Sequence, residues 1–211
     1  MKDKKRNGPL SKIKNFMNHS GKGAGFEIII EEKSITSIKT KKPPCEETGY
    51  HVHEHGEIPD ENLTIYISIE TITRIKKHAL EDTNRELGGM LVGELNEYDG
   101  EKYINIITSI PARHTNQSGS SVTFTHQTWE EVFRTMDNDY RDEMIVGWYH
   151  THPNFGIFLS GDDLFIHKNF FNQEWLVALV VDPVRNHSGF FNWKNGEIIR
   201  TSGYYSYMKM E

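Results

Sequence analysis

Residues 63–201 alternate between short apolar runs of strand length and segments with helical periodicity, and this order constrains the fold most. The predicted strands are 63–67, 87–95, 103–110, 122–124, 144–150, 175–181, 189–193 and 198–201. Predicted helices cover 69–82, the residues after Thr125, and 161–172. Strands interleaved with helices favour a sheet covered by helices, of class α/β or α+β.

Short signals fix several boundaries. Ser68 and Thr125 each precede a helical pattern and are good N-terminal caps. Asp99-Gly100 and Asn195-Gly196 are typical of tight turns between paired strands.

The first 62 residues have a different character. We expect residues 1–25, rich in Gly and charge, to be mobile, and 26–30 to form an isolated strand. Residues 39–61 are broken by prolines and glycines and are interpreted as a linker. The predicted division is therefore a basic tail and linker over 1–62 and a compact domain over 63–211.

Charge and composition exclude several classes of function. Residues 1–42 hold eleven Lys/Arg and four Asp/Glu, whereas the remainder holds thirteen and twenty-six. An acidic main domain repels a phosphate backbone, which argues against nucleic-acid binding. The single cysteine, Cys45, excludes an intramolecular disulfide framework and a cysteine-rich zinc module. No apolar run approaches the roughly 20 residues of a membrane helix, so we expect a cytoplasmic protein. The oligomeric state stays open.

The segment Gly147-Trp148-Tyr149-His150-Thr151-His152-Pro153 is the most informative one for chemistry. On a strand, residues two apart share a face, so His150 and His152 project the same way. Neutral imidazoles at that spacing are suited to zinc. Because such pairs also occur as ordinary surface histidines, the pair alone is a weak signal.

Two acidic residues extend this hypothesis. Ser160, followed three residues later by Asp163, fits an N-terminal helix cap, and it can also place Asp163 beside the histidines as a third metal ligand. Three protein ligands leave a position for water, as in catalytic zinc sites. Glu86 is a candidate general base ahead of Gly88-Gly89, although it can equally be the charged end of a connection.

Residues 146–163 resemble the signature of the JAMM (MPN-plus) zinc metalloproteases, which is His-x-His-Pro, then Gly, then Ser-x-x-Asp. The spacing matches throughout, including Gly156. The segment that begins at Glu86 resembles the upstream Glu segment of that family, and residues 181–183 resemble its strand end after the metal helix. The resemblance extends over roughly residues 63–205.

This resemblance implies a fold, a reaction and a set of roles. The fold is a three-layer sandwich with a central mixed β-sheet between helices, similar to cytidine deaminases. The reaction is zinc-dependent hydrolysis of the amide bond after the C-terminus of a ubiquitin-like modifier, so a ubiquitin-like protein or its conjugate is the expected partner. The implied roles are Zn2+ ligands for His150, His152 and Asp163, general base for Glu86 and oxyanion donor for Ser160. The Ser-x-x-Asp spacing selects Asp163 over Asp162.

Two other function classes stay open. One is a zinc peptidase that processes a sulfur-carrier-like protein or a small peptide. The other is a non-catalytic scaffold of the same fold, which normally lacks metal ligands that are all present here.

A second histidine cluster, His51, His53 and His55, also alternates along the chain. It can bind a transition metal, but we interpret it as a solvated part of the linker. We interpret the isolated His114, His126, His167 and His187 as structural or surface residues.

Overall fold

The computed structural model describes residues 13–15, 26–28, 38–58, 63–113, 115–117 and 122–210. The chain divides into two compact units, residues 1–38 and 39–211. In the first unit, β1 (Ile13–Asn15) pairs antiparallel with β2 (Phe26–Ile28). The strand predicted at 26–30 is present over Phe26–Ile28, and it is paired rather than isolated. Most of the segment predicted to be mobile, 1–25, lies outside the described residues.

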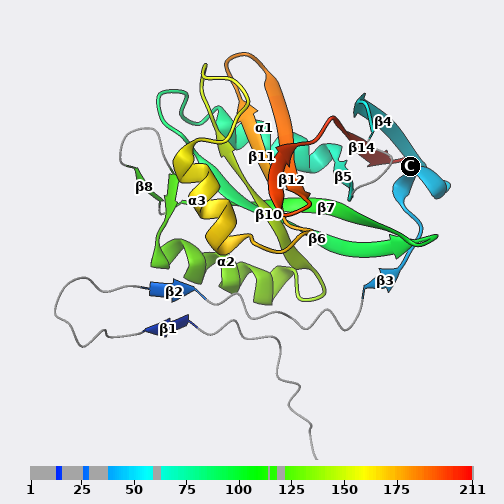
Figure 1. Cartoon of the computed structure of the whole chain (residues 1–211), viewed down its shortest axis with the longest axis horizontal. Helices are drawn as coiled ribbons and strands as arrows, with labels where there is room; N and C mark the ends of the chain where they lie inside the picture. Colours follow the sequence, from blue (N-terminus) through cyan, green and yellow to red (C-terminus); the bar gives the residue numbers. More distant parts are fainter. Residues whose placement is uncertain are drawn as a thin grey trace, which may run out of the picture. The chain divides into compact units, whose positions relative to one another are not determined.

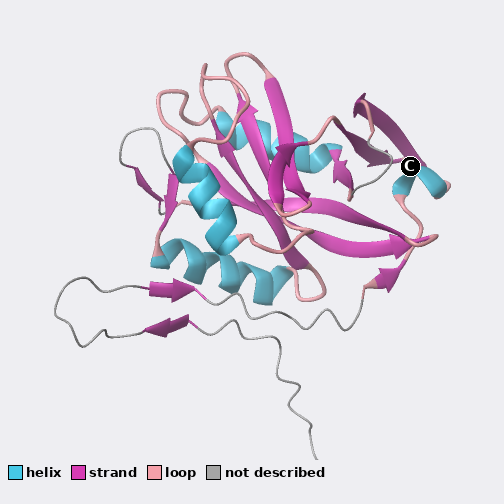
Figure 2. Cartoon of the chain, in the orientation of Figure 1, coloured by secondary structure: helices cyan, strands magenta, loops and turns pink. Residues whose placement is uncertain are grey.

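The second unit is built on one large mixed sheet, which Figures 1 and 2 show as the central layer of arrows. Its described strands are β3 (Lys39–Thr40), β4 (Tyr50–Gly56), β5 (Thr64–Ser68), β6 (Gly88–Tyr98), β7 (Glu101–Pro111), β10 (Met144–Thr151), β11 (Val177–Asp182), β12 (His187–Lys194), β13 (Glu197–Arg200) and β14 (Gly203–Lys209). The order is β13-β12-β11-β10-β6-β7-β5-β14-β4, and β3 also pairs with β6. A separate hairpin joins β8 (Thr115–Gln117) to β9 (Val122–Phe124).

Helices lie on both faces of this sheet. The helices are α1 (Ile69–Ala79), α2 (His126–Asp139) and α3 (Gly161–Phe170), with a short 3-10 turn at Pro44–Glu46. Tyr149 on β10 hydrogen-bonds His78 of α1, whereas its neighbour Trp148 stacks on Phe171 after α3. Adjacent strand residues face opposite ways, so α1 covers one face and α3 the other. The predicted α/β architecture, a mixed sheet between helices, is confirmed.

Local signals in the sequence explain the helix boundaries. The Ser68 and Thr125 side chains accept hydrogen bonds from the third backbone N–H of α1 and α2, so both predicted caps are confirmed. Helix α1 ends at Ala79, three residues before the predicted end. Just beyond it, the Asp82 carboxylate accepts a hydrogen bond from the Asn84 N–H, a local turn that competes with helix.

The interpretation of residues 39–61 as a linker is wrong for two segments. Strand β4 pairs antiparallel with β14 along its whole length, and β3 pairs with β6. The compact unit consequently begins at residue 39 rather than at 63. Strand β4 is held by an aromatic cluster that no local pattern shows: Tyr50 packs edge-on against Tyr207, with ring centroids 5.5 Å apart.

The centre of the sheet is fully buried. All six residues of β11 are buried, as expected for the strand predicted there. A Cβ atom added to Gly89 would lie 2.6 Å from the Tyr149 ring, so glycine at this position permits β6 to approach β10. No helix among the described residues is long and apolar enough to cross a membrane.

Candidate metal centre

One candidate histidine ligand, His150, lies in strand β10, and the other, His152, lies one residue beyond its end. His150 and His152 have exposed fractions of 0% and 2%. Their Nε2 atoms face each other at 3.1 Å, as the two-residue spacing on a strand predicts. His150 is flanked by Gly88 on β6 and Val180 on β11, so the pair lies at a central position of the sheet. These are deeply buried imidazoles rather than surface histidines.

Helix α3 supplies the carboxylate. Ser160 and Asp163 form a reciprocal cap, in which the Ser160 Oγ accepts from the Asp163 N–H and the Asp163 Oδ2 accepts from the Ser160 N–H at 2.7 Å. Asp163 is buried and faces the histidines, whereas its neighbour Asp162 is exposed. The cap and the placement of a ligand are thus compatible readings of the same four residues.

The three side chains converge closely enough to hold one ion. Asp163 Oδ1 lies 3.3 Å from His150 Nε2, and Asp163 Oδ2 lies 3.5 Å from His152 Nε2. All three potential ligand atoms lie within 4.8 Å of one another. Two neutral nitrogens and one carboxylate oxygen are a donor set that suits zinc. The residues present therefore fit the ion that the sequence predicts.

The protonation preferences agree with this fit for two of the ligands. Burial lowers the pKa of His150, which favours the neutral form that a metal requires. For Asp163, burial acts to raise the pKa, but hydrogen bonds from His150 and His152 outweigh it and hold the pKa well below its usual range. The pKa of His152 is raised despite burial, because Asp163 and Glu86 stabilise the imidazolium in the absence of an ion.

Glu86 lies beside this group without joining it. Its Oε1 is 3.7 Å from His152 Nε2, and its side chain is 7% exposed. Burial raises the pKa of Glu86 to about 7, with the negative charges of Asp163 and Asp162 adding to the rise and His152 opposing it. A carboxylate with a pKa near neutrality, next to a metal position, has the properties of a general base.

The Ser160 hydroxyl caps α3 and also helps to lower the pKa of the Asp163 carboxylate. The hydroxyl oxygen accepts from the Asp163 N–H at 3.2 Å, and a hydroxyl that accepts still has one O–H to donate. The residue is half-buried at the start of α3, so the cap does not prevent the predicted oxyanion role.

Trp148 and His167 support the candidate ligands, and His167, which the sequence indicates as a structural or surface residue, is buried. Trp148 shares a face with His150, and their rings stack at 4.6 Å. The Trp148 Nε1–H donates to Nδ1 of His167, which is buried and lies four residues after Asp163 on α3. The strand alternation alone indicates the Trp148–His150 contact, but nothing local indicates His167.

Asp182 holds the loop that follows His152. Its carboxylate is fully buried and accepts four backbone hydrogen bonds. Two come from the loop that follows β10 and His152, and two come from the β11–β12 turn. The donors are the N–H groups of Asn154, Gly156, Val184 and Arg185. The resemblance identified residues 181–183, but it did not indicate this function.

The other candidates do not join the centre. His53 and His55 contact each other on β4, and His55 hydrogen-bonds Ser206 at 2.7 Å, outside the three-residue group. Cys45 is exposed and contacts the Tyr66 hydroxyl at 3.0 Å rather than a base. His126 and His187 are exposed, and the side chain of His114 lies outside the described residues.

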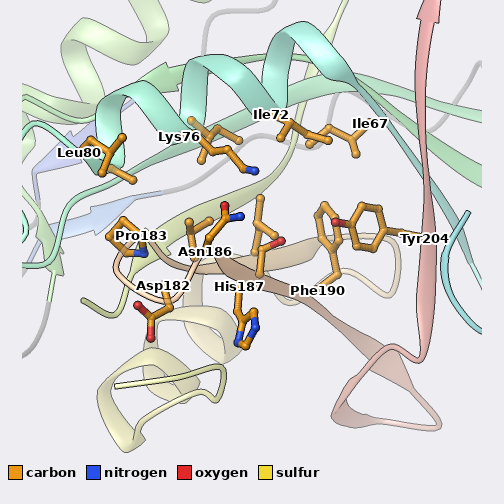
Figure 3. Close-up of a pocket in the computed structure, with 15 residues that line it drawn as sticks. Ile67, Ile72, Lys76, Leu80, Asp182, Pro183, Asn186, His187, Phe190 and Tyr204 are labelled. Carbon is orange, nitrogen blue, oxygen red and sulfur yellow. The ribbon is translucent and has the colours of Figure 1, made fainter. Parts of the chain in front are cut away.

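A cleft of about 90 Å³ lies on the α1 side of the sheet (Figure 3). Lys76 of α1 and Leu80, the residue that follows α1, line one side of the cleft, and Asn186 and His187 of the β11–β12 region line the other. Most of the other lining residues are apolar, among them Ile67, Ile75, Leu179, Val181 and Phe190. None of the three candidate ligands lines the cleft, so it is distinct from the metal centre.

A mixed sheet between helices, with two histidines at the end of a central strand and just beyond it, and a carboxylate at a helix start, defines an α/β domain with a candidate three-ligand metal centre. Residues 60–174 match the JAB1/Mov34/MPN/PAD-1 ubiquitin protease family. The chain belongs to this family, and the resemblance drawn from the sequence is confirmed.

Curated relatives agree with the family match. The chain is 33% identical over 147 residues to the 26S proteasome non-ATPase regulatory subunit 14 of Dictyostelium discoideum, covering 67% of this chain and 45% of the relative. It is 32% identical over 136 residues to the ubiquitin carboxyl-terminal hydrolase RPN11 of Saccharomyces cerevisiae, covering 62% and 42%. The matched region thus spans less than half the length of these relatives.

Proposed function

We propose that this protein is a zinc-dependent isopeptidase that hydrolyses the amide bond after the C-terminus of a ubiquitin-like modifier. The observation that carries the proposal is the convergence of His150, His152 and Asp163 within 4.8 Å, with the buried Glu86 carboxylate 3.7 Å from His152. Three ligands and an adjacent base are the arrangement of hydrolytic rather than structural zinc.

The residues have distinct tasks in this proposal. When bound, zinc supplies Lewis acidity, which acidifies water and polarises a carbonyl oxygen. His150, His152 and Asp163 would hold the ion. Glu86 would accept a proton from the attacking water and deliver it to the departing amine. The Ser160 hydroxyl would donate a hydrogen bond to the developing oxyanion, a contribution typically worth about 10²–10³ in rate.

The substrate class rests on the relatives. One relative carries the name ubiquitin carboxyl-terminal hydrolase, and the matched family is described as a ubiquitin protease. We extend that chemistry to this chain and propose a ubiquitin-like protein or its conjugate as substrate. We also propose a cytoplasmic location, with which the single cysteine is consistent.

Cleavage of defined fusions tests the proposal. Full-length protein loaded with zinc is incubated with ubiquitin, and with other Gly-ended ubiquitin-like proteins, each joined through its C-terminal carboxyl group to a fluorogenic amine. We expect release of the amine from at least one fusion, loss of release on chelation, and recovery when zinc is restored. An unrelated peptide joined to the same amine is the control. A zinc-loaded protein that cleaves no fusion, or cleaves the control peptide equally well, contradicts the proposal.

A further inference from the structure

The position of Glu86 needs an explanation beyond its own contacts. Its Oε2 atom is buried without a hydrogen-bond partner in the described part of the chain, so no partner fixes that end of the carboxylate. The residue precedes β6 in a segment, 80–87, that contains no helix or strand. Apart from the approach of Oε1 to His152 at 3.7 Å, the position of the side chain depends on the backbone next to it.

Thr151 contacts that backbone twice. Its Oγ1 accepts a hydrogen bond from the Leu87 N–H at 2.8 Å, and its own N–H donates to the Leu87 carbonyl oxygen at 2.8 Å. Thr151 is fully buried and lies between the two histidine ligands. One residue thus joins the strand that carries the metal ligands directly to the neighbour of Glu86.

The two contacts depend differently on the side chain. Any residue at position 151 except proline can donate its N–H to Leu87. The Leu87 N–H, in contrast, is received by the side chain of residue 151, and serine and threonine provide a hydroxyl acceptor of this length. Strand alternation also directs the Thr151 side chain away from the face of His150 and His152. The hydroxyl can therefore be removed without removing a ligand atom.

We propose that Thr151 is a positioning residue for the reaction, because its hydroxyl fixes Leu87 and thereby holds the Glu86 carboxylate beside the metal ligands. This inference rests on the proposed function and adds a residue to it. A displacement of about 1 Å at a reacting group can lower a rate by about 10²-fold, so even a small shift of Glu86 is expected to be measurable.

The test compares four variants of the full-length, zinc-loaded protein. Thr151→Val keeps the shape of the side chain and removes the acceptor, and Thr151→Ala is a second hydroxyl-free variant if valine does not fold. Thr151→Ser restores the hydroxyl. Thr108→Val is the matched control, because the Thr108 hydroxyl is also buried but has no hydrogen-bond partner among the described residues.

We expect Thr151→Val to keep its zinc and its KM while kcat falls by about 10- to 100-fold, the pattern of an interaction needed in the transition state. Thr151→Ser should recover most of kcat, and Thr108→Val should match wild type. Amide hydrogen exchange at Leu87, measured by NMR, should accelerate in Thr151→Val and not in Thr151→Ser.

Three results would overturn the inference: equal kcat in Thr151→Val and Thr108→Val, loss of zinc together with rate, or unchanged exchange at Leu87. The exchange measurement does not depend on hydrolysis. A wild-type protein that cleaves nothing therefore contradicts the proposed function, whereas unchanged exchange at Leu87 contradicts the positioning role.

Discussion

Two carboxylates next to His152 differ in their surroundings, and the difference separates their roles. Both imidazoles lie within 3.5 Å of the Asp163 carboxylate and hold its pKa low. Glu86 lacks a hydrogen-bond partner for Oε2 among the described residues, and burial raises its pKa to about 7. A permanently ionised carboxylate is a suitable ligand, and one that titrates near neutrality is a suitable proton carrier.

The raised pKa of Glu86 has a consequence for the stability of the metal-free protein. Because the folded pKa of about 7 exceeds the ordinary value of 4.5, the folded state binds more protons than the unfolded state between these values. The wild type should lose stability relative to Glu86→Gln as pH rises through this window. With a chelator present, we expect the melting temperature of Glu86→Gln to exceed that of wild type at about pH 8. This difference in melting temperature should disappear by about pH 4.5.

Thermal melts of both proteins across this range check the prediction. Glu101→Gln, which changes an exposed glutamate at the start of β7, is the control. Its melting temperature should differ from that of wild type by the same amount at every pH. If the difference in melting temperature between Glu86→Gln and wild type is constant with pH, or grows towards low pH, burial does not control the ionisation of Glu86.

At the scale of elements, the site depends on where β10 and β11 end. The two strands are parallel, so their carboxyl ends lie at the same edge of the sheet. His150 lies near the end of β10, His152 follows its last residue, and Asp182 is the last residue of β11. Asp182 connects the two, because its carboxylate binds backbone N–H groups from the loop after His152 and from the β11–β12 turn. The loop that leads to Ser160 is therefore anchored at one buried carboxylate.

Removing the Asp182 carboxylate should lower the stability of the fold and loosen the loop that leads to Ser160. Asp182→Ala leaves four backbone donors without their acceptor, and we expect a loss of at least about 2 kcal/mol in the free energy of unfolding. Asp142→Ala, at an exposed aspartate in a turn, should change stability by less than about 0.5 kcal/mol. Denaturant unfolding of the two variants is the measurement. Equal stabilities would show that Asp182 does not anchor the loop.

Elements with local signals were predictable, and those held by distant partners were not. The capped helices α1 and α2, the turn at Asp99-Gly100 and the His-x-His strand follow from spacing that the sequence displays. Strands β4 and β14 pair across about 150 residues and depend on packing between tyrosines, because strand preference is set by neighbours rather than by the backbone alone.

The same distinction applies to the site. Ser160 and Asp163 are three residues apart and share one helix cap, so their proximity was predictable. The hydrogen bond from the Leu87 N–H to the Thr151 hydroxyl joins residues 64 positions apart. It can be recognised only once β6 and β10 are placed side by side. Glu86 was identified through the family resemblance, because its own surroundings in the sequence favoured an ordinary connection.

At the scale of the whole molecule, the second unit carries every residue assigned to the site. It extends over residues 39–211 and contains the family match at 60–174. The matched relatives are more than twice as long as the shared region, so their assemblies and partners do not transfer with the fold. What this unit does contain is a complete set of candidate ligands, base and oxyanion donor, and the central claim therefore concerns those residues.

Zinc content and turnover, measured together on Glu86→Gln and Asp163→Asn, test that claim most directly. Glu86→Gln removes a proton acceptor but no proposed ligand, so we expect one equivalent of zinc in both wild type and Glu86→Gln, while hydrolysis falls by about 10²–10⁴-fold in the variant. Asp163→Asn weakens a ligand, so zinc occupancy and hydrolysis should fall together. If Glu86→Gln loses its zinc, or if Asp163→Asn keeps full occupancy, the assignment of base and ligands is wrong.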